Sequence, residues 1–266
     1  MVFERLKSTV TTKDGIEWYY EQEGVGPHVV LIPDGLGECQ MMDKPMSLIA
    51  SAGFTVTTFD MPGMSRSSNA PVESYKGVTG HKLATQLDTL MEHLEIAKAS
   101  FWGCSAGALA VLGLCAHYPS RVRNAMPHEA PLHLMDQLKD LPSLDDETLI
   151  ASMAAISKAS CRDDEAWNSL GPEVHQRLRR NFIRWAHGYI SDLTLSPPIE
   201  TENLRKRPIS WTVGADSPMF MFFSNVVTAT KADIPIKTLP GGHFPYVSHP
   251  EQMSKHIVEA TRSHLP

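Results

Sequence analysis

The sequence predicts an α/β fold: a mostly parallel sheet flanked by helices, with a helical cap domain inserted into it. Short apolar runs alternate with helix-like segments along most of the chain, which is typical of parallel strands buried between layers of helices. A stretch between about residues 132 and 195 interrupts this alternation with helical periodicity and few strand signals. Because the strand pattern resumes afterwards, we interpret the stretch as an insertion.

The strands are predicted from short apolar runs, several of which end at glycine, proline or aspartate. The first, residues 16–23, is expected near a hairpin. The predicted strands that follow it are 28–32, 53–59, 99–102, 122–129, 209–214 and 234–239. The helices expected between them are 47–52, 78–94, 106–117, 225–231 and 250–265.

The domain organisation follows from the interruption. Residues 1–132 and 196–266 are predicted to form one core domain, and residues 133–195 a helical cap (lid) domain that ends near Ser196-Pro197-Pro198. An independent second domain is the alternative interpretation, and the return of the strand pattern disfavours it.

Composition narrows the classes of partner. The chain has 266 residues, a formal net charge of −6 and no basic patch, which argues against a nucleic-acid or anionic-membrane partner. No apolar run reaches the roughly 18 residues that a spanning helix needs, so no membrane partner is expected. The first residues lack the apolar region of a signal peptide, and the four cysteines form no C-x-x-C pair. We therefore expect a cytoplasmic protein.

The pentapeptide Gly103-Cys104-Ser105-Ala106-Gly107 matches G-x-S-x-G, and it lies between a predicted strand and a predicted helix. This context predicts a nucleophile elbow, a sharp turn that presents a serine at the edge of the sheet. The glycines allow the helix and a neighbouring strand to approach closely. Ser105 is therefore the candidate nucleophile; the alternative is a glycine-rich turn with a surface serine.

A serine nucleophile needs a base and an acid that orients the base. His243 follows the last predicted strand and a Gly-Gly pair that could direct its imidazole at Ser105. Two carboxylates lie between Ser105 and His243 in the chain: Glu129, at the end of a predicted strand, and Asp216, after the next one. Position alone mildly favours Asp216. No histidine spacing of the H-E-x-x-H kind supports a metal site.

The oxyanion of an acyl-transfer intermediate needs two N–H donors. One is expected from Ala106, after the nucleophile, and the other from Gly35 in the loop that follows an early strand. Asp34 and Leu36 flank Gly35 and are expected to contact substrate. Apolar and aromatic residues of the cap and its surroundings are expected to form the pocket and to favour a bulky, apolar substrate; they are Met135, Leu138, Trp185, Tyr189 and Phe222.

Taken together, these segments resemble the α/β-hydrolase superfamily, and more closely the fungal zearalenone hydrolases (zearalenone lactonases). The match runs from about residue 15 to residue 265 and is weakest at about 141–164. The segments that carry it are 18–24, 33–40, 57–67, 102–105, 123–126, 211–215 and 243–250.

The resemblance implies a serine hydrolase that cleaves the ester bond of zearalenone, a macrocyclic resorcylic acid lactone, with no cofactor and as a homodimer. It implies a triad of Ser105, His243 and Glu129, which reverses the positional preference for Asp216. It also implies backbone donation by Gly35 and substrate contact by Trp185. The chain departs from the family in carrying a carboxylate at 216 and alanine instead of serine at 106. The alternatives are another carboxylesterase or lactonase, and a ligand receptor on a hydrolase fold.

Overall fold

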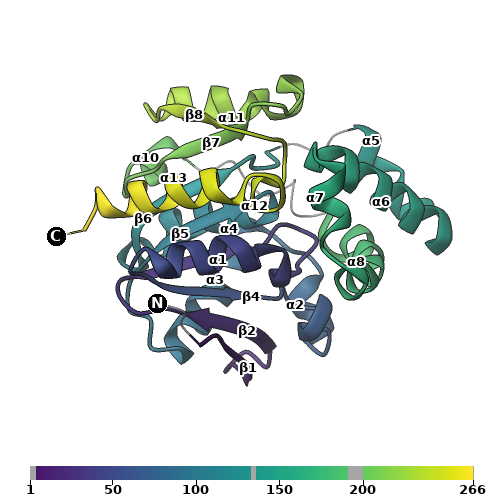
Figure 1. Ribbon diagram of the computed structural model, residues 1–266, viewed down its shortest axis with the longest axis horizontal. Coiled ribbons are helices and arrows are strands. Elements are labelled where there is room, and N and C mark those ends of the chain that lie inside the picture. Colours follow the sequence, from purple (N-terminus) through teal and green to yellow (C-terminus); the bar gives the residue numbers. More distant parts are fainter. Residues whose placement is uncertain (1–3, 133–135, 191–199, 266) are drawn as a thin grey trace.

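In the part of the chain that the structure describes, eight strands form one sheet with the order β1-β2-β4-β3-β5-β6-β7-β8 (Figure 1). The computed structural model describes residues 4–132, 136–190 and 200–265. The antiparallel pairs β1–β2 and β2–β4 form one end of the sheet, and the neighbouring strands from β4 to β8 are parallel. The strands are β1 (Leu6–Thr11), β2 (Glu17–Glu23), β3 (His28–Ile32), β4 (Thr55–Phe59), β5 (Ala99–Cys104), β6 (Val122–His128), β7 (Trp211–Gly214) and β8 (Ile236–Leu239).

The predicted α/β fold is confirmed, and each predicted strand has a counterpart in β2 to β8. Only β1 was not predicted. Its side chains are exposed or half-buried along the whole strand, because it lies at the edge of the sheet and pairs only with β2. A strand without a buried face gives no apolar run in the sequence, so the rule that found the other strands does not detect it.

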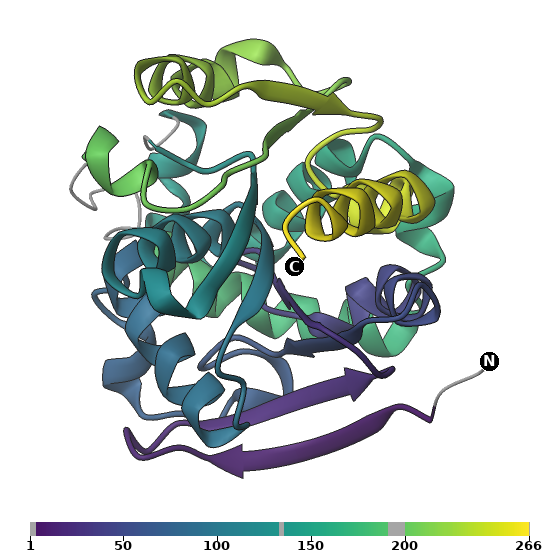
Figure 2. The same cartoon turned by 90° about the vertical axis from the view of Figure 1, so that its left-hand side faces the viewer.

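Helices cover both faces of the sheet, as Figure 2 shows from the side. One face packs on α1 (Asp43–Ser51) and α13 (Pro250–Arg262), and the opposite face on α3 (Gly80–His93) and α4 (Ala106–His117). Nearly all of α4 is buried, since it lies in the middle of its layer. Shorter elements connect these layers: η1 (Cys39–Met42), η2 (Ser65–Ser67), α2 (Val72–Tyr75), η3 (Pro119–Arg121), α10 (Thr201–Leu204) and α12 (Pro245–Ser248). A longer helix, α11 (Met219–Lys231), lies between β7 and β8 in the chain.

The helices formed by residues 136–184, between β6 and β7, gather at one side of the sheet, to the right in Figure 1. Both predicted boundaries of the cap domain, at residues 133 and 195, lie outside the described residues. No helix among the described residues combines the length and apolar character that crossing a membrane requires. The elements before α10 are α5 (Asp136–Lys139), η4 (Leu141–Ser143), α6 (Asp146–Cys161), α7 (Asp164–Asn168), α8 (Pro172–Arg184) and the π-helix η5 (Trp185–Tyr189).

Candidate active site

Ser105 occupies a sharp turn between β5 and α4. Its backbone has φ 53° and ψ −118°, a conformation that L-residues rarely adopt, and its N–H donates to the carbonyl of His128 on the neighbouring strand at 3.0 Å. Two residues later, a Cβ on Gly107 would overlap the carbonyl oxygens of Ile32 and Pro33. Only glycine therefore lets α4 start so close to β3, and Ser105 is left lining a cavity.

His243 and Glu129 meet at the same edge of the sheet. His243 Nδ1 lies 2.6 Å from Glu129 Oε2, and the other carboxylate oxygen accepts the N–H of Gly214 at 2.7 Å. Glu129 follows β6 directly and also has a positive φ, 48°, while its N–H donates to the carbonyl of Thr212 at 3.1 Å. Backbone groups of β7 thus hold the carboxylate in place against the imidazole.

The pKa of Glu129 is lowered to about 2, although the side chain is fully buried. Burial alone would raise it, but the hydrogen bond with His243 and the nearby imidazoles of His128 and His243 outweigh that penalty. Burial acts in the other direction on a histidine, and it lowers the pKa of His128 to about 4. The Glu129 carboxylate that faces His243 is therefore ionised, and the neighbouring imidazole of His128 is neutral.

Asp216, the other candidate acid, is exposed. Its backbone N–H donates to the carbonyl of Gly241 at 3.0 Å, in the turn that follows β7. In the structure Glu129 therefore contacts His243, and Asp216 is exposed to solvent.

The loop after β3 is a tight turn fixed by Asp34. The Asp34 carboxylate accepts the N–H of Leu36 at 3.0 Å, and its carbonyl accepts the N–H of Gly37 at 3.1 Å. A Cβ on Gly35 would overlap the indole nitrogen of Trp185, so this position requires glycine. The Asp34 side chain is buried, and burial raises its pKa.

Ala106 is the first residue of α4. Its N–H belongs to the first turn of that helix, whose N–H groups have no acceptor within the helix. Ser105, Gly35 and the loop around it all line one cavity.

That cavity has a volume of about 200 Å³ and a mostly apolar wall. A cavity of about 150 Å³ in another protein binds benzene, so the space admits at least an aromatic ring. Phe222 forms part of the wall and stacks on the His243 ring, with centroids 5.5 Å apart. The predicted site residues in the wall are Asp34, Gly35, Leu36, Ser105, Leu138, Trp185, Phe222 and His243.

Two residues predicted for the pocket wall are not among the described residues that line the cavity. Tyr189 is fully buried in the core, where its hydroxyl donates to the carbonyl of Pro62 at 2.9 Å, and it does not belong to the cavity wall. This differs from the expectation, because the last turn of η5 directs the ring toward the loop after β4. Met135 lies outside the described residues.

Sequence reasoning missed the contribution of α6 to the wall. Met153, Ile156 and Ser157 come from this helix, and the backbone N–H of His243 donates to the carbonyl of Ser160 near its end at 2.9 Å. The sequence pattern that could have indicated it is the four-residue spacing of Leu149, Met153 and Ser157, which form the buried face of α6. Periodicity shows that such a face is covered, but it does not show what covers it.

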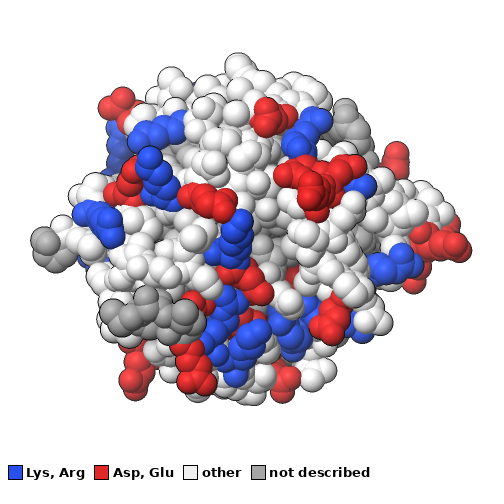
Figure 3. Space-filling model, viewed as in Figure 1, with Lys and Arg blue, Asp and Glu red and all other residues white. Residues whose placement is uncertain are grey.

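Within the described residues, no group of three or more His, Cys, Asp or Glu side chains could hold a metal ion. Acidic and basic side chains are interspersed on the face shown in Figure 3. The arrangement can activate a hydroxyl nucleophile and can bind an apolar ligand beside it.

Comparisons with known proteins identify the family and the relatives of this chain. The model of the α/β-hydrolase fold family matches residues 27–250. A zearalenone hydrolase of Cladophialophora bantiana is 60% identical over 265 residues, with 100% of both chains covered. A zearalenone hydrolase of Bionectria ochroleuca is 51% identical over 263 residues, which cover 98% of this chain and 100% of the relative. The enol-lactonase from Burkholderia xenovorans LB400 superposes with a TM-score of 0.77 at 16% identity, covering 96% of this chain and 100% of that one, which shows the shared fold.

Proposed function

The chain belongs to the α/β-hydrolase family, among the zearalenone hydrolases, and on that premise we propose that it hydrolyses the lactone ester of zearalenone or a closely related macrolactone. The observation that carries the proposal is the 2.6 Å contact between His243 Nδ1 and Glu129 Oε2, at the wall of an apolar cavity that also contains Ser105. A serine nucleophile, a histidine base and a carboxylate that orients the histidine are the parts of an acyl-transfer site.

The first step of the proposed mechanism is acylation. Glu129 binds Nδ1 of His243 and leaves Nε2 to accept the Ser105 proton as Oγ attacks the lactone carbonyl carbon. The tetrahedral intermediate then collapses, the ring C–O bond breaks, and the imidazolium returns its proton to the departing alkoxide. The alcohol stays tethered to the acyl group because both belong to one ring.

The second step is hydrolysis of the acyl-enzyme. His243 takes a proton from water, the hydroxide attacks the Ser105 ester, and the Ser105 oxygen recovers a proton from the imidazolium. The product is a ring-opened hydroxy acid that is heavier than the lactone by one water.

The developing oxyanion in both steps would be stabilised by the N–H groups of Gly35 and Ala106. These two groups come from different segments, one from the loop after β3 and one from the first turn of α4. The loss of one such donor in a serine protease costs about 2.7–4 kcal/mol. The positive end of the α4 dipole also favours negative charge near Ser105.

Incubation of the purified protein with zearalenone, followed by chromatography and mass spectrometry, tests the proposal. We expect the lactone peak to fall and the ring-opened acid, or a product formed from it by loss of carbon dioxide, to accumulate over many turnovers. A simple p-nitrophenyl ester serves as the comparison substrate. Turnover of that ester alone would overturn the lactone assignment, and tight binding of zearalenone without turnover would indicate a receptor instead.

A further inference from the structure

A stripe of side chains on α8 contacts the loop that carries Gly35. Arg177, Asn181 and Trp185 are spaced by four residues, so they lie on one face of the helix and its continuation into η5. Trp185 packs against Gly35, as described above. The two residues before it in the stripe make the polar contacts that bind the cap to the edge of the sheet.

Asn181 is the centre of this contact. Its side chain is 2% exposed, and its amide nitrogen donates to the carbonyl of Leu36 at 2.6 Å and to the Ser65 hydroxyl at 2.7 Å. Its amide oxygen accepts the backbone N–H of Ser65 at 2.9 Å. A buried amide with this many partners is fixed in orientation, because each lost hydrogen bond would leave a buried polar atom unsatisfied.

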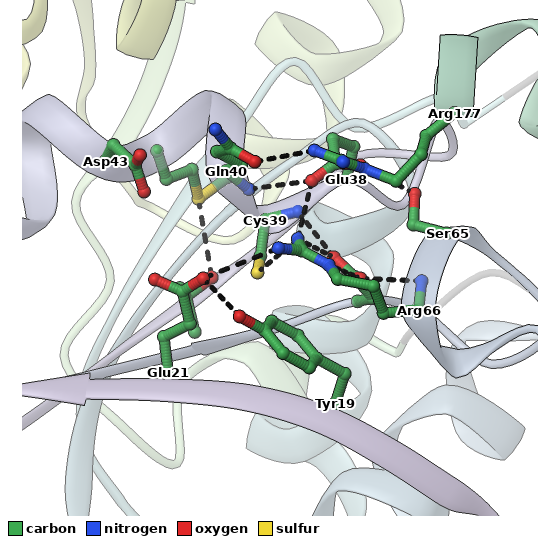
Figure 4. Close-up of polar contacts among 12 residues, drawn as sticks. Tyr19, Glu21, Glu38, Cys39, Gln40, Asp43, Ser65, Arg66 and Arg177 are labelled. Carbon is green, nitrogen blue, oxygen red and sulfur yellow. Dashed lines mark hydrogen bonds and ion pairs between the residues drawn. The ribbon is translucent and has the colours of Figure 1, made fainter. Parts of the chain in front are cut away.

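A charged group next to Asn181 holds the same two loops together. Glu38 is 1% exposed; its carboxylate accepts the Ser65 hydroxyl at 2.8 Å and the guanidinium groups of Arg66 and Arg177 at 2.6 and 2.5 Å. Figure 4 shows both guanidinium groups directed at Glu38, one from η2 and the other from the cap helix. Three hydrogen-bonded donors compensate the burial of this carboxylate.

The Leu36 carbonyl is the start of a chain of hydrogen bonds that ends at Gly35. It shares its peptide group with the N–H of Gly37, which donates to the carbonyl of Asp34 at 3.1 Å. That carbonyl in turn shares its peptide group with the N–H of Gly35. Because C=O and N–H point in opposite directions in a trans peptide, each bond in the chain orients the next.

We propose that Asn181 is a positioning residue, which orients and polarises the Gly35 N–H through the two peptide groups of the Asp34–Gly37 turn. The inference rests on the proposed function, in which that N–H stabilises the oxyanion. Hydrogen bonds in a buried chain polarise one another, so the amide of Asn181 strengthens the donor two peptides away. The cap then contributes to the chemistry itself as well as to the shape of the pocket.

Two near-isosteric variants test the proposal. Asn181→Leu removes every hydrogen bond of the side chain, and Asn181→Asp keeps the acceptor for Ser65 but has no amide donor for Leu36. We expect each to lower kcat by about 10–50-fold, less than the roughly 10²–10³-fold loss when an oxyanion donor itself is removed. KM for the lactone should stay within about threefold, since Asn181 does not line the cavity and its replacement leaves the ground-state contacts unchanged.

A transition-state analogue separates positioning from a general loss of structure. A phenyl trifluoromethyl ketone adds to a serine nucleophile and places an oxyanion between the two N–H donors. Its Ki should rise in both variants by the same factor as kcat falls, while the Kd of the ring-opened product stays unchanged. A Ki that stays at the wild-type value while kcat falls, or a kcat within twofold of wild type in either variant, overturns the proposal.

Asn124→Leu is the matched control. Asn124 is 1% exposed, accepts the Ser100 hydroxyl at 2.5 Å, and lies at the opposite end of β6 from Glu129. We expect this variant to lower the free energy of unfolding and leave kcat and the ketone Ki unchanged; an equal kcat loss would assign the effect of Asn181 to stability and overturn the proposal. Failure of the proposed function would appear instead in the wild type, as absent lactone turnover, and the ketone and p-nitrophenyl acetate would still test Asn181.

Discussion

The cavity has a floor and a roof that are built differently. The floor consists of the strand-end segments that carry Asp34–Gly37, Ser105, Glu129 and His243, and backbone hydrogen bonds between neighbouring strands and turns hold these residues. The roof consists of α6, α8 and η5, and apolar side chains such as Met153 and Ile190 form its wall. Polar contacts between the two are made by one stripe of α8 and by the Ser160 carbonyl of α6, which accepts the N–H of His243.

The difference indicates how the work is divided. Acyl transfer needs atoms placed within a few tenths of an ångström, and the strained backbone at Ser105 and Glu129 is held by the sheet around it. Binding of an apolar ligand needs shape and area, which helices supply with many small contacts. Changes to the floor should therefore affect kcat, and changes to the apolar wall of the roof should affect KM, whereas changes at Asn181, in the stripe of α8 that contacts the floor, should affect kcat.

Ser105→Ala removes the nucleophile from the floor and should have the largest effect. We expect kcat to fall by at least about 10⁴-fold, because removing the nucleophile of another serine hydrolase costs about 2 × 10⁶-fold. Binding of zearalenone, measured by isothermal titration, should persist, since the roof is unchanged. Residual turnover within tenfold of the wild type would contradict the assignment of Ser105 as the nucleophile.

The floor should also make stability depend on pH. The pKa of Glu129 is about 2 in the folded protein, against 4.5 for an ordinary glutamate, so the ionised carboxylate stabilises the fold above about pH 4.5. This contribution is lost as the pH falls from about 4.5 toward 2, and it amounts to at most about 3 kcal/mol at 1.36 kcal/mol per pKa unit. Urea unfolding of the wild type and Glu129→Gln at pH 6, 4.5 and 3.5 measures it. The difference in free energy of unfolding between the wild type and Glu129→Gln should decrease as the pH falls. A difference that stays constant would contradict the account.

Gly35→Ala acts where floor and roof touch. The new methyl would overlap the Trp185 indole nitrogen, so the loop or the ring must shift, and we expect about 100-fold lower kcat from a misplaced N–H donor. Gly77→Ala is the control. Gly77 has a positive φ, unlike Gly35, but a Cβ there would meet open space, so stability should fall with kcat unchanged. Equal kcat losses in the two variants would assign the effect at 35 to a general loss of stability and not to the displaced N–H donor.

Met153→Ala tests the roof by itself. Met153 is 4% exposed and lines the cavity from α6. Loss of its apolar contact should raise KM about tenfold, equivalent to about 1.4 kcal/mol, with kcat within twofold. Met219→Ala, at a half-exposed position at the start of α11, should leave both constants unchanged. A kcat loss larger than the KM change at Met153 would show that the apolar wall of the roof also places reacting atoms.

The floor was largely predictable from the sequence because its signals are local. Ser105 was identified by a strand, a turn and a helix within a few residues, and His243 by a Gly-Gly turn after the last strand. The choice between Glu129 and Asp216 was not local. Both follow strands that end at the same edge, and only the three-dimensional arrangement places one carboxylate in a buried gap beside β7 and leaves the other exposed.

The roof could not be predicted in the same detail. Helical periodicity shows that Met153 and Tyr189 face something apolar, but one faces the cavity and the other the core. Asn181 has an ordinary sequence context, and its importance comes from partners that lie 145 and 116 residues away in the chain. Long-range polar contacts of this kind leave no pattern in a single sequence.

The account depends most on the carboxylate that supports His243, and kcat for zearalenone in Glu129→Gln and Asp216→Asn tests it directly. We predict a loss of at least about 10³-fold in Glu129→Gln, because the amide cannot hold the imidazole in the tautomer that accepts the Ser105 proton. Asp216→Asn should stay within twofold of the wild type, since its backbone N–H is unchanged and the residue is exposed. Full activity in Glu129→Gln together with a large loss in Asp216→Asn would contradict the account and move the acid to the turn after β7.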